Sequence, residues 1–584
     1  MGKITHSSPG TELSLANYTS DSAHLINGVA DLNIVRTATY VIATSDAPDI
    51  WKAQADEVLI GTTDIATLNT YTTLASADGG GTIVISPGHV YCETSYLPKN
   101  YVSLIGQGIG ITTLLLSTNR NLINGYDSDT GQHDISIKNL TLDVQYPTYT
   151  RFGIITNGYY NIVLDTIEMK NAGFSNLRAY NSHDWHVNRV YSHDFNGGLA
   201  GGDVGEDGIA FFSTTADNYN IWVTNCIVSD GGGGGIKVTG AGHTAAYLAH
   251  GIWITGCIVQ DITQTGIWVT NDLATATRNY DVHIIGNTSI NCLHGGEVIT
   301  TNDSEVIGQH SFNCTGIGQQ VESSSRITVA DGVFCNNSDH GLSIGSNDSN
   351  LVGSDHCRVV NNVSYNNGTS THSWDAAITL CYGSSYNIVE GNTCYDTNTP
   401  CIQPYGIQER LGADYNTIIN NELRNNLTAN YVAFNESGAG THSKVVNNNG
   451  WISSGEVRSA SGSLTSGNAN AIGFAWHNPE GQDILIKKIA VNVTTGGGTV
   501  GSHLDVGIAD DAAGTNRGTE FFNDLLLNTA QVDDSWVAGD GGTQTKWVSC
   551  QDSASATDGW VVGQILDANA ASLVGSYYIE FVGK

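Results

Sequence analysis

Two nearly identical stretches follow one another in the middle of this chain. Residues 218–240 read NYNIWVTNCIVSDGGGGGIKVTG, and residues 249–271 read AHGIWITGCIVQDITQTGIWVTN. Related segments continue at intervals of 22 to 31 residues to about residue 448, and weaker copies precede them. A period of this size indicates a solenoid in which each copy forms one coil. A shift of 31 positions pairs these residues: Trp222 with Trp253, Cys226 with Cys257, Asp230 with Asp261, and Ile236 with Ile267.

The repeated unit predicts strands rather than helices. Each copy contains a segment of the form G-I-x-V, and its apolar and polar residues alternate, as in Ile236-Lys237-Val238. A period of two is typical of a strand with one buried face. A leucine-rich repeat would need a Leu framework that is missing here. Stacked parallel strands therefore fit best, with Asn in turns that need left-handed backbone and hydrogen-bond along the stack.

The start of the repeat region carries a family resemblance. GGGTIVISPGHVY at 79–91 and YVSLIGQGIGITTL at 101–114 are similar to the opening of many right-handed parallel β-helix proteins of the pectate-lyase-like superfamily. The chain most resembles bacteriophage tailspikes and related polysaccharide depolymerases, over about residues 79–453. This resemblance implies a polysaccharide partner, a homotrimer, and an extracellular or virion-associated location. The fold alone does not fix the chemistry, because it carries many activities.

The repeat divides the chain. From about Trp451 the coil period stops, and separate strand-like segments follow a polar linker. The predicted fold class is all-β, a right-handed parallel β-helix solenoid followed by a C-terminal β-sandwich. The predicted domains are an N-terminal segment (1–45), a lead-in with a capping helix (46–100), the parallel β-helix (101–455), and a sandwich for trimerisation or carbohydrate binding (456–584).

Composition narrows the class of partner. The formal net charge is −33, which disfavours nucleic acid and anionic membranes. We expect no membrane insertion, because no apolar run approaches the length of a bilayer span, and no signal peptide is visible. The 11 cysteines include no CxxC pair, and several recur at the repeat spacing. We therefore expect buried thiols in a core column rather than a zinc site.

The repeat locates one outward column of side chains, where solenoids often bind ligands. Aligning the G-I-x-V segments places Arg178, Ala210, Lys237 and Trp268 in one file, one coil apart. The copies differ most here, which marks a position that the fold does not dictate. Arg178 and Lys237 would bind an acidic group of a polymer, and Trp268 would offer a sugar ring an apolar face.

Two polar insertions lead into this file. The first places Asp203, Glu206 and Asp207 just before the strand of Ala210, and the second carries His243 and Tyr247. Two carboxylates facing a glycosidic bond can hydrolyse it, one as acid and the other as base or nucleophile. The sequence thus predicts a hydrolase with Asp207, Glu206 and Asp203 as catalytic candidates. Arg178, Lys237, Trp268, His243 and Tyr247 are the candidates for substrate binding.

Other interpretations remain open at this point. Lys237 could be the base of a β-elimination lyase acting on a uronic-acid polysaccharide, with Ca²⁺ bound near Asp203 and Asp207. No cofactor is required for hydrolysis. The acidic segment could also be a solvated loop, and the chain a non-catalytic glycan-binding adhesin or virion stalk.

Two further residues stand out in the repeat. HGLSIGS at 340–346 resembles a polygalacturonase motif, but Gly318 and Gln319 stand where carboxylates would be needed, so that assignment is declined and His340 is expected in a turn. Glu297 falls in an inward position by alignment, so either the strand slips by one residue or a carboxyl is buried and perturbed.

Overall fold

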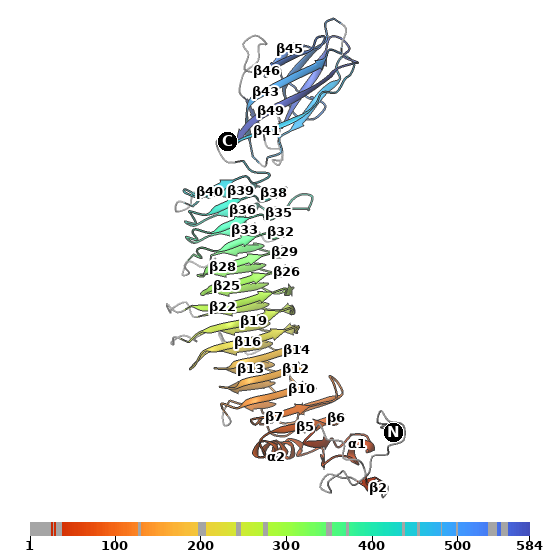
Figure 1. Cartoon of the computed structure of the whole chain (residues 1–584), viewed down its shortest axis with the longest axis vertical. Helices are drawn as coiled ribbons and strands as arrows, with labels where there is room; N and C mark the ends of the chain where they lie inside the picture. The colour runs from red at the N-terminus through yellow and green to blue at the C-terminus, as the bar shows by residue number, and fades with distance from the viewer. Residues whose placement is uncertain are drawn as a thin grey trace, which may run out of the picture.

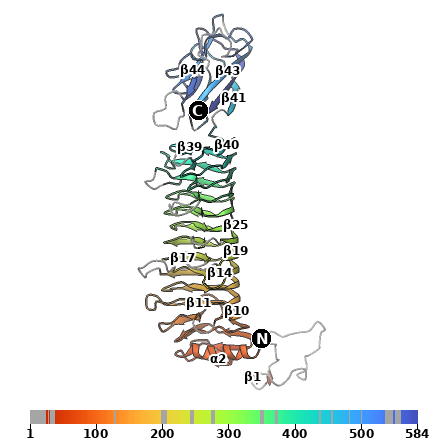
Figure 2. The same ribbon diagram turned by 90° about the vertical axis from the view of Figure 1, so that its left-hand side faces the viewer.

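The computed structural model contains a long parallel β-helix followed by an antiparallel β-sandwich (Figures 1 and 2). The predicted fold class is therefore confirmed. The structure describes residues 25–26, 29–30, 38–126, 130–196, 206–240, 247–271, 278–345, 353–368, 373–434, 439–452, 456–480, 482–497, 500–534, 546–549 and 559–583. Asp203 and His243 lie outside these residues, as does most of the segment 1–45.

One wall of the β-helix is a parallel sheet of twelve strands within the described residues. It carries the G-I-x-V segments, and we call it the twelve-stranded sheet. In spatial order its strands are β9 (Ile123–Gly125), β11 (Ile154–Asn157), β13 (Leu177–Tyr180), β15 (Ile209–Phe212), β18 (Ile236–Thr239), β21 (Ile267–Thr270), β24 (Gly296–Ile299), β27 (Gln319–Glu322), β30 (Leu342–Ile344), β33 (Ala376–Leu380), β36 (Tyr405–Glu409) and β39 (Ala429–Ala433).

Two lateral columns of parallel strands complete each coil, and three long strands run through both columns. The long strands are β10 (His133–Asp143), β12 (Tyr160–Lys170) and β14 (His183–Phe195). The first column also contains β3 (Tyr40–Ala43), β4 (Glu57–Val58), β5 (Gly81–Ile85), β7 (Val102–Ile105), β16 (Asn218–Thr224), β19 (Ala249–Thr255), β22 (Asn279–Ile285), β25 (Thr301–Ile307), β28 (Ser325–Ala330), β31 (Arg358–Val360), β34 (Ile388–Glu390), β37 (Thr417–Ile419) and β40 (Lys444–Val446). The second also contains β6 (Gly88–Cys92), β8 (Thr112–Leu116), β17 (Ile227–Gly231), β20 (Ile258–Ile262), β23 (Thr288–Ile290), β26 (His310–Phe312), β29 (Val333–Cys335), β32 (Val363–Tyr365), β35 (Thr393–Tyr395) and β38 (Glu422–Arg424).

Matching inward residues of successive coils form the core. Ile209, Ile236 and Ile267 are register partners in consecutive strands, and all three are fully buried. Cys226, Cys257 and further thiols are buried and free, as the sequence predicted. Small apolar side chains at fixed positions let each coil stack directly on the previous one.

Buried asparagines tie the later coils together. The side-chain Nδ2 of Asn362 donates to Oδ1 of Asn392 at 3.0 Å, and the same bond links Asn392 to Asn421 and Asn421 to Asn448. Each Oδ1 also accepts the backbone N–H of the preceding Asn. The residue before a ladder Asn, such as Asn361, has a positive φ. Asn therefore has two roles at these turns. Before the ladder residue it adopts the left-handed backbone conformation, and in the ladder its side-chain amide hydrogen-bonds to the next coil.

A helix covers the N-terminal end of the stack (Figure 2). The segment expected to cap the β-helix forms α2 (Asp64–Ala77), which packs against β5 and β6. Its Ile65, Leu68 and Ala75 are fully buried in the solenoid core. The shorter α1 (Asp49–Lys52) precedes it, and β1 (Leu25–Ile26) pairs with β2 (Val29–Ala30).

The C-terminal part consists of two antiparallel sheets packed around a second core. One sheet contains β41 (Val457–Ser463), β49 (Val574–Gly583), β43 (Ile484–Thr495), β46 (Gln531–Asp534) and β47 (Lys546–Val548). The other contains β42 (Ile472–His477), β48 (Trp560–Leu566), β44 (His503–Ala509) and β45 (Phe522–Leu526).

Candidate functional site

The outward file predicted from the repeat exists in the structure. Arg178 pairs with Ala210, Ala210 with Lys237, and Lys237 with Trp268 in adjacent strands of the twelve-stranded sheet. The residues on either side of each, such as Ile236 and Val238, point into the core. The same file continues through Glu297 and Gln320. We call this row the outward file.

The cations of the file lie against aromatic rings. The Arg178 guanidinium is 5.2 Å from the ring centre of Phe152 and 4.8 Å from that of Phe212. The Lys237 Nζ lies 3.8 Å from the ring centre of Trp268. Such cation–π contacts hold a charged group where few water molecules reach it. Both cations are nearly buried, although they point away from the core.

Asp207 lies between the two cations. Its Oδ1 accepts the N–H of Gly234 at 3.2 Å, and its Oδ2 is 3.9 Å from an Arg178 nitrogen. Burial raises the pKa of the Asp207 carboxyl, while Lys237 and Arg178 act in the opposite direction. The side chain has 0% exposure, whereas neighbouring Glu206 keeps 7%. The structure thus brings together Arg178, Glu206, Asp207 and Lys237.

Several polar atoms of this cluster have no hydrogen-bond partner among the described residues. They are Nε and Nη2 of Arg178, Oδ2 of Asp207 and Nε1 of Trp268. Buried polar groups are normally hydrogen-bonded, so orphaned atoms in one place need an explanation. Nε and Nη2 form the edge of the guanidinium that binds a carboxylate through two parallel bonds. The cluster is therefore suited to a polar, acidic ligand.

Glu297 belongs to the outward file, which corrects its expected inward position. Glu297 pairs with Trp268, and Gly296 takes the inward position opposite Ile267. Two consecutive glycines made the alignment ambiguous by one residue. The side chain of Gln319 from the next coil occupies the space where a Cβ on Gly296 would lie. The strand thus slips by one residue relative to the sequence alignment.

The Glu297 carboxyl is also perturbed. Burial raises its pKa to about 7, although a hydrogen bond with Thr265 and the Lys237 charge act in the opposite direction. His294 Nε2 lies 3.6 Å from Glu297 Oε1. Nδ1 of that imidazole accepts the N–H of Ile317, so its proton sits on Nε2 and faces the carboxyl. A carboxyl that is half protonated near neutral pH is suited to donate a proton.

A second carboxyl, which the repeat pattern does not predict, follows one coil later. Glu322 lies on β27, next to the strand of Glu297 and two residues further along. Strand spacing places the two backbone positions about 8 Å apart on the outer face. The side-chain amide of Gln320 donates to Glu322 Oε1. Its segment, QQVES, lacks the G-I-x-V pattern that marked the file elsewhere.

His340 lies in a turn, as expected, with Asp339 and Asp375 close to its ring. His340 Nδ1 accepts the N–H of Ala376 at 3.0 Å, which leaves the ring proton on Nε2, 3.5 Å from Asp339 Oδ1. An imidazole in this state has no lone pair left for a metal ion. In this tautomer His340 is paired with Ala376 and Asp339, and its ring offers no ligand atom to a metal ion.

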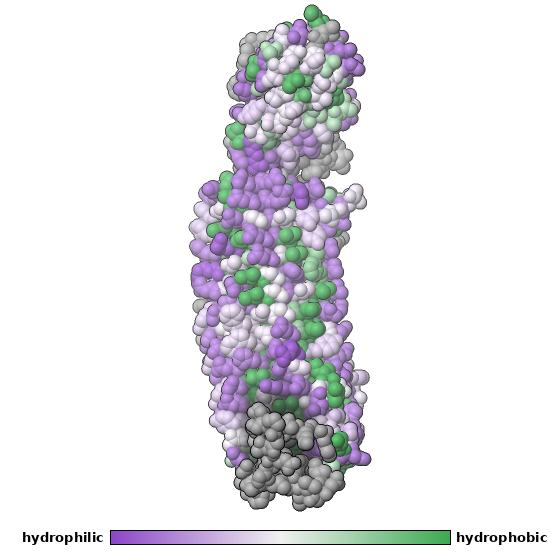
Figure 3. Space-filling view, turned by 45° about the vertical axis from the view of Figure 1, so that its right-hand side comes forward, coloured by the Kyte–Doolittle hydropathy of each residue, from purple (hydrophilic) through white to green (hydrophobic). Residues whose placement is uncertain are grey.

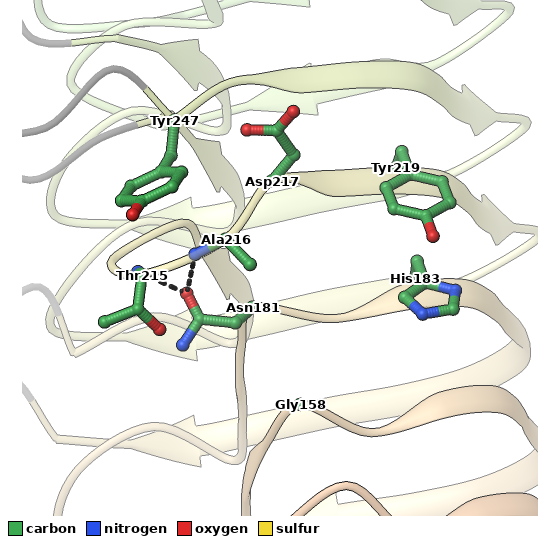
Figure 4. Close-up of a pocket in the computed structure, with 8 residues that line it drawn as sticks. All are labelled: Gly158, Asn181, His183, Thr215, Ala216, Asp217, Tyr219 and Tyr247. Carbon is green, nitrogen blue, oxygen red and sulfur yellow. Dashed lines mark hydrogen bonds between the residues drawn. The ribbon is translucent and has the colours of Figure 1, made fainter.

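Tyr247 lies apart from the outward file. It lines a separate pocket at the ends of β13 and β15, shown in Figure 4. Trp222 and Trp253 are on the first lateral column, where they stack on His186 and His283 with ring-centre distances of 4.5 and 3.7 Å. The structure thus separates these aromatic residues from the charged cluster.

Comparisons with known proteins add little beyond the fold. No family model and no curated protein matches the chain. Among solved structures, the A-module of Azotobacter vinelandii mannuronan C-5 epimerase AlgE6 is 15% identical with a TM-score of 0.45, and the match covers 66% of this chain and 95% of that one. A mutant tailspike of E. coli bacteriophage HK620 in complex with a pentasaccharide is 12% identical with a TM-score of 0.45, covering 90% and 91%. The Dettilon tailspike is 13% identical with a TM-score of 0.34, covering 90% and 92%.

Neither of the described α-helices has the length and apolar character that a membrane span requires. Within the described part of the solenoid, the strands of each coil pair in parallel with the strands of the next coil. The chain is a parallel β-helix protein with a C-terminal antiparallel β-sandwich.

Proposed function

We propose that the protein is a polysaccharide depolymerase that hydrolyses glycosidic bonds on the outer face of the twelve-stranded sheet. The observation that carries this proposal is the Glu297 carboxyl, whose pKa is about 7, one coil from Glu322. Glu297 is the proton donor to the leaving oxygen, and Glu322 is the base that activates water. A raised pKa suits Glu297 to the role of the acid, and Glu322 is a second carboxyl on the same outer face.

Exposure distinguishes the acidic residues of the site. Glu297 and Glu322 keep 8% and 5% exposure, whereas Asp207 has none. A group without exposed surface cannot meet a substrate directly in this arrangement. We therefore assign Asp207 to positioning Arg178 and Lys237. Glu206, at 7% exposure, stays a further acidic candidate beside the cluster. The proposed reaction is still hydrolysis, as expected from the sequence. Its two carboxyls, however, are those of Glu297 and Glu322, further along the twelve-stranded sheet than the predicted acidic residues.

The spacing of two catalytic carboxyls determines the stereochemistry of hydrolysis. Inverting glycosidases separate their two carboxyls by about 6.5–9.5 Å, to leave room for water, and retaining ones by about 5–5.5 Å. The anomeric configuration of the product, followed by NMR during cleavage, distinguishes these two arrangements at Glu297 and Glu322.

The substrate is an acidic polysaccharide. The charges of Arg178 and Lys237, which lie just under the outer face, would attract an acidic unit of the polymer. Trp268, which is partly exposed, would pack against a sugar ring. No resident metal is needed, because protein side chains supply the acid, the base and the positive charge.

The test uses a panel of acidic bacterial capsule and exopolysaccharides. The native protein should release reducing ends without a rise in absorbance at 235 nm, and Glu297→Gln and Glu322→Gln should each lower the rate by about 10²–10⁴-fold. Glu390→Gln, a partly buried carboxyl on the first lateral column, is the matched control. A rise at 235 nm would instead mark a lyase using Lys237. No product from any polysaccharide that binds would indicate an adhesin.

We also propose a homotrimer that acts outside the cell or on a virion. Figure 3 shows apolar side chains along one face of the solenoid. On the first lateral column, Ile285, Ile307, Ala330 and Val360 follow one another in register on the outer face, each partly exposed. An exposed apolar stripe of this length favours contact with other copies of the chain.

Mass in solution tests this assembly. Light scattering should give three times the chain mass of 61.8 kDa. Ile307→Lys should shift the mass toward a single chain, whereas Leu74→Lys on helix α2, also at an exposed apolar residue, should not. A native protein that runs as one chain would refute the trimer.

A further inference from the structure

A pocket of about 660 Å³ lies beside the outward file, and the mechanism above does not use it. It sits at the corner where β13 and β15 end and the chain turns toward β14 and β16. Figure 4 shows the side chains gathered around this space. The lining residues are Gly158, Asn181, His183, Thr215, Ala216, Asp217, Tyr219 and Tyr247.

The floor of the pocket is fixed by hydrogen bonds. Asn181 Oδ1 accepts the backbone N–H groups of Thr215 at 2.8 Å and Ala216 at 3.1 Å. Asp217 Oδ1 accepts the N–H of Leu248 at 2.8 Å. These bonds hold the turn between β15 and β16 in one conformation, so the pocket is formed before any ligand arrives.

The pocket offers one aromatic face and several polar edges. His183 and Tyr219 belong to a ring stack, with their centres 4.4 Å apart and their planes 4° from parallel, so neighbouring rings cover their faces. Tyr247 takes part in no ring stack among the described residues, and its ring lines the pocket (Figure 4). Flat apolar faces beside hydroxyl and carboxylate groups are what a sugar ring requires.

The charge of the pocket is opposite to that of the Arg178 cluster. Among the described residues, no Lys or Arg lines the pocket, whereas Asp217 does. Asp184 is nearby, with its Oδ2 2.7 Å from His183 Nδ1. Burial raises the pKa of the Tyr219 hydroxyl, and the charges of Asp184 and Asp217 raise it further. An anionic sugar would be repelled here, whereas a neutral ring would not.

We propose that this pocket binds one neutral sugar ring, stacked on Tyr247 and hydrogen-bonded by Asp217. The pocket adjoins the Arg178 cluster, because Phe212 contacts the Arg178 guanidinium and lies three residues before Thr215, which lines the pocket. If the depolymerase function holds, the substrate is a heteropolymer that carries a neutral unit next to an acidic one. The binding site itself does not depend on cleavage.

The test is saturation-transfer NMR with single sugars at millimolar concentration. The probes are the methyl glycosides of glucose, galactose, mannose and rhamnose, together with N-acetylglucosamine and glucuronate. At least one neutral probe should bind the native protein and lose about tenfold in affinity in Tyr247→Ala. Glucuronate should bind only after Asp217→Asn, which keeps the Oδ1 acceptor for Leu248.

The outcomes separate this site from the catalytic one. Glu297→Gln should bind the neutral probe as the native protein does, so a failed cleavage assay leaves the pocket standing. Binding that is unchanged in Tyr247→Ala, or no transfer to any neutral probe, would overturn the proposal. Equal binding of glucuronate and neutral sugars to the native protein would also overturn it.

Discussion

Glu297→Gln should make the protein more stable at high pH while it removes the proposed proton donor. Burial raises the Glu297 pKa from its ordinary value of 4.5 to about 7. The folded chain therefore holds a proton that the unfolded chain releases between these two values. Stability is then present below pH 4.5 and is lost as pH rises to about 7. At about 1.4 kcal/mol per pH unit, the loss is about 3 kcal/mol.

Glutamine cannot ionise, so the variant escapes this loss. The difference in unfolding free energy between Glu297→Gln and the native protein should grow by about 3 kcal/mol from pH 4.5 to pH 8. Denaturant unfolding followed by far-UV circular dichroism at several pH values measures it. Glu390→Gln serves as the control for the same chemical change. A difference that stays constant across this pH range would refute the perturbed carboxyl and, with it, the proposed acid.

Three further perturbations test other parts of the account. Asp207→Asn removes the charge that faces Arg178 and Lys237 and should lower depolymerase activity by about tenfold or more, measured as reducing ends at fixed substrate; an unchanged rate would exclude the positioning role. Asn392→Ala removes a buried amide that makes two ladder bonds, accepts the N–H of Asn362 and donates to the carbonyls of Val359 and Glu390. It should cost about 1–3 kcal/mol in thermal or denaturant unfolding, with no loss expected if the amides were solvated. Incubation with EDTA should leave cleavage unchanged, and activity restored by added Ca²⁺ would show that a metal takes part.

The register of the site could be predicted because the inward residues repeat. Matching Ile and Val positions aligned Arg178, Lys237 and Trp268 correctly, since a one-residue error would have placed apolar side chains outside. The same alignment left Glu297 open between a one-residue slip and a buried carboxyl, because two glycines provide no side chain to fix the register. The structure shows the slip. Glycine has no side chain whose polarity would indicate whether its position faces the core or the solvent. Only the strand pairing in the structure could therefore establish the register.

The chemistry of the site was harder to predict than its place. An outward position suggests exposure, yet Arg178 and Asp207 are nearly or fully buried by their neighbours. Burial decides both the pKa of Glu297 and the exclusion of Asp207 from direct contact, and it depends on side chains from several coils. Glu322 escaped notice because its segment departs from the repeat, although it pairs with the coil of Glu297.

Cleavage of an acidic polysaccharide by the native protein and by Glu297→Gln and Glu322→Gln tests the central claim most directly. We expect new reducing ends, no absorbance at 235 nm, and a loss of about 10²–10⁴-fold in rate in each variant. Full activity in both variants, or an unsaturated product, would contradict it.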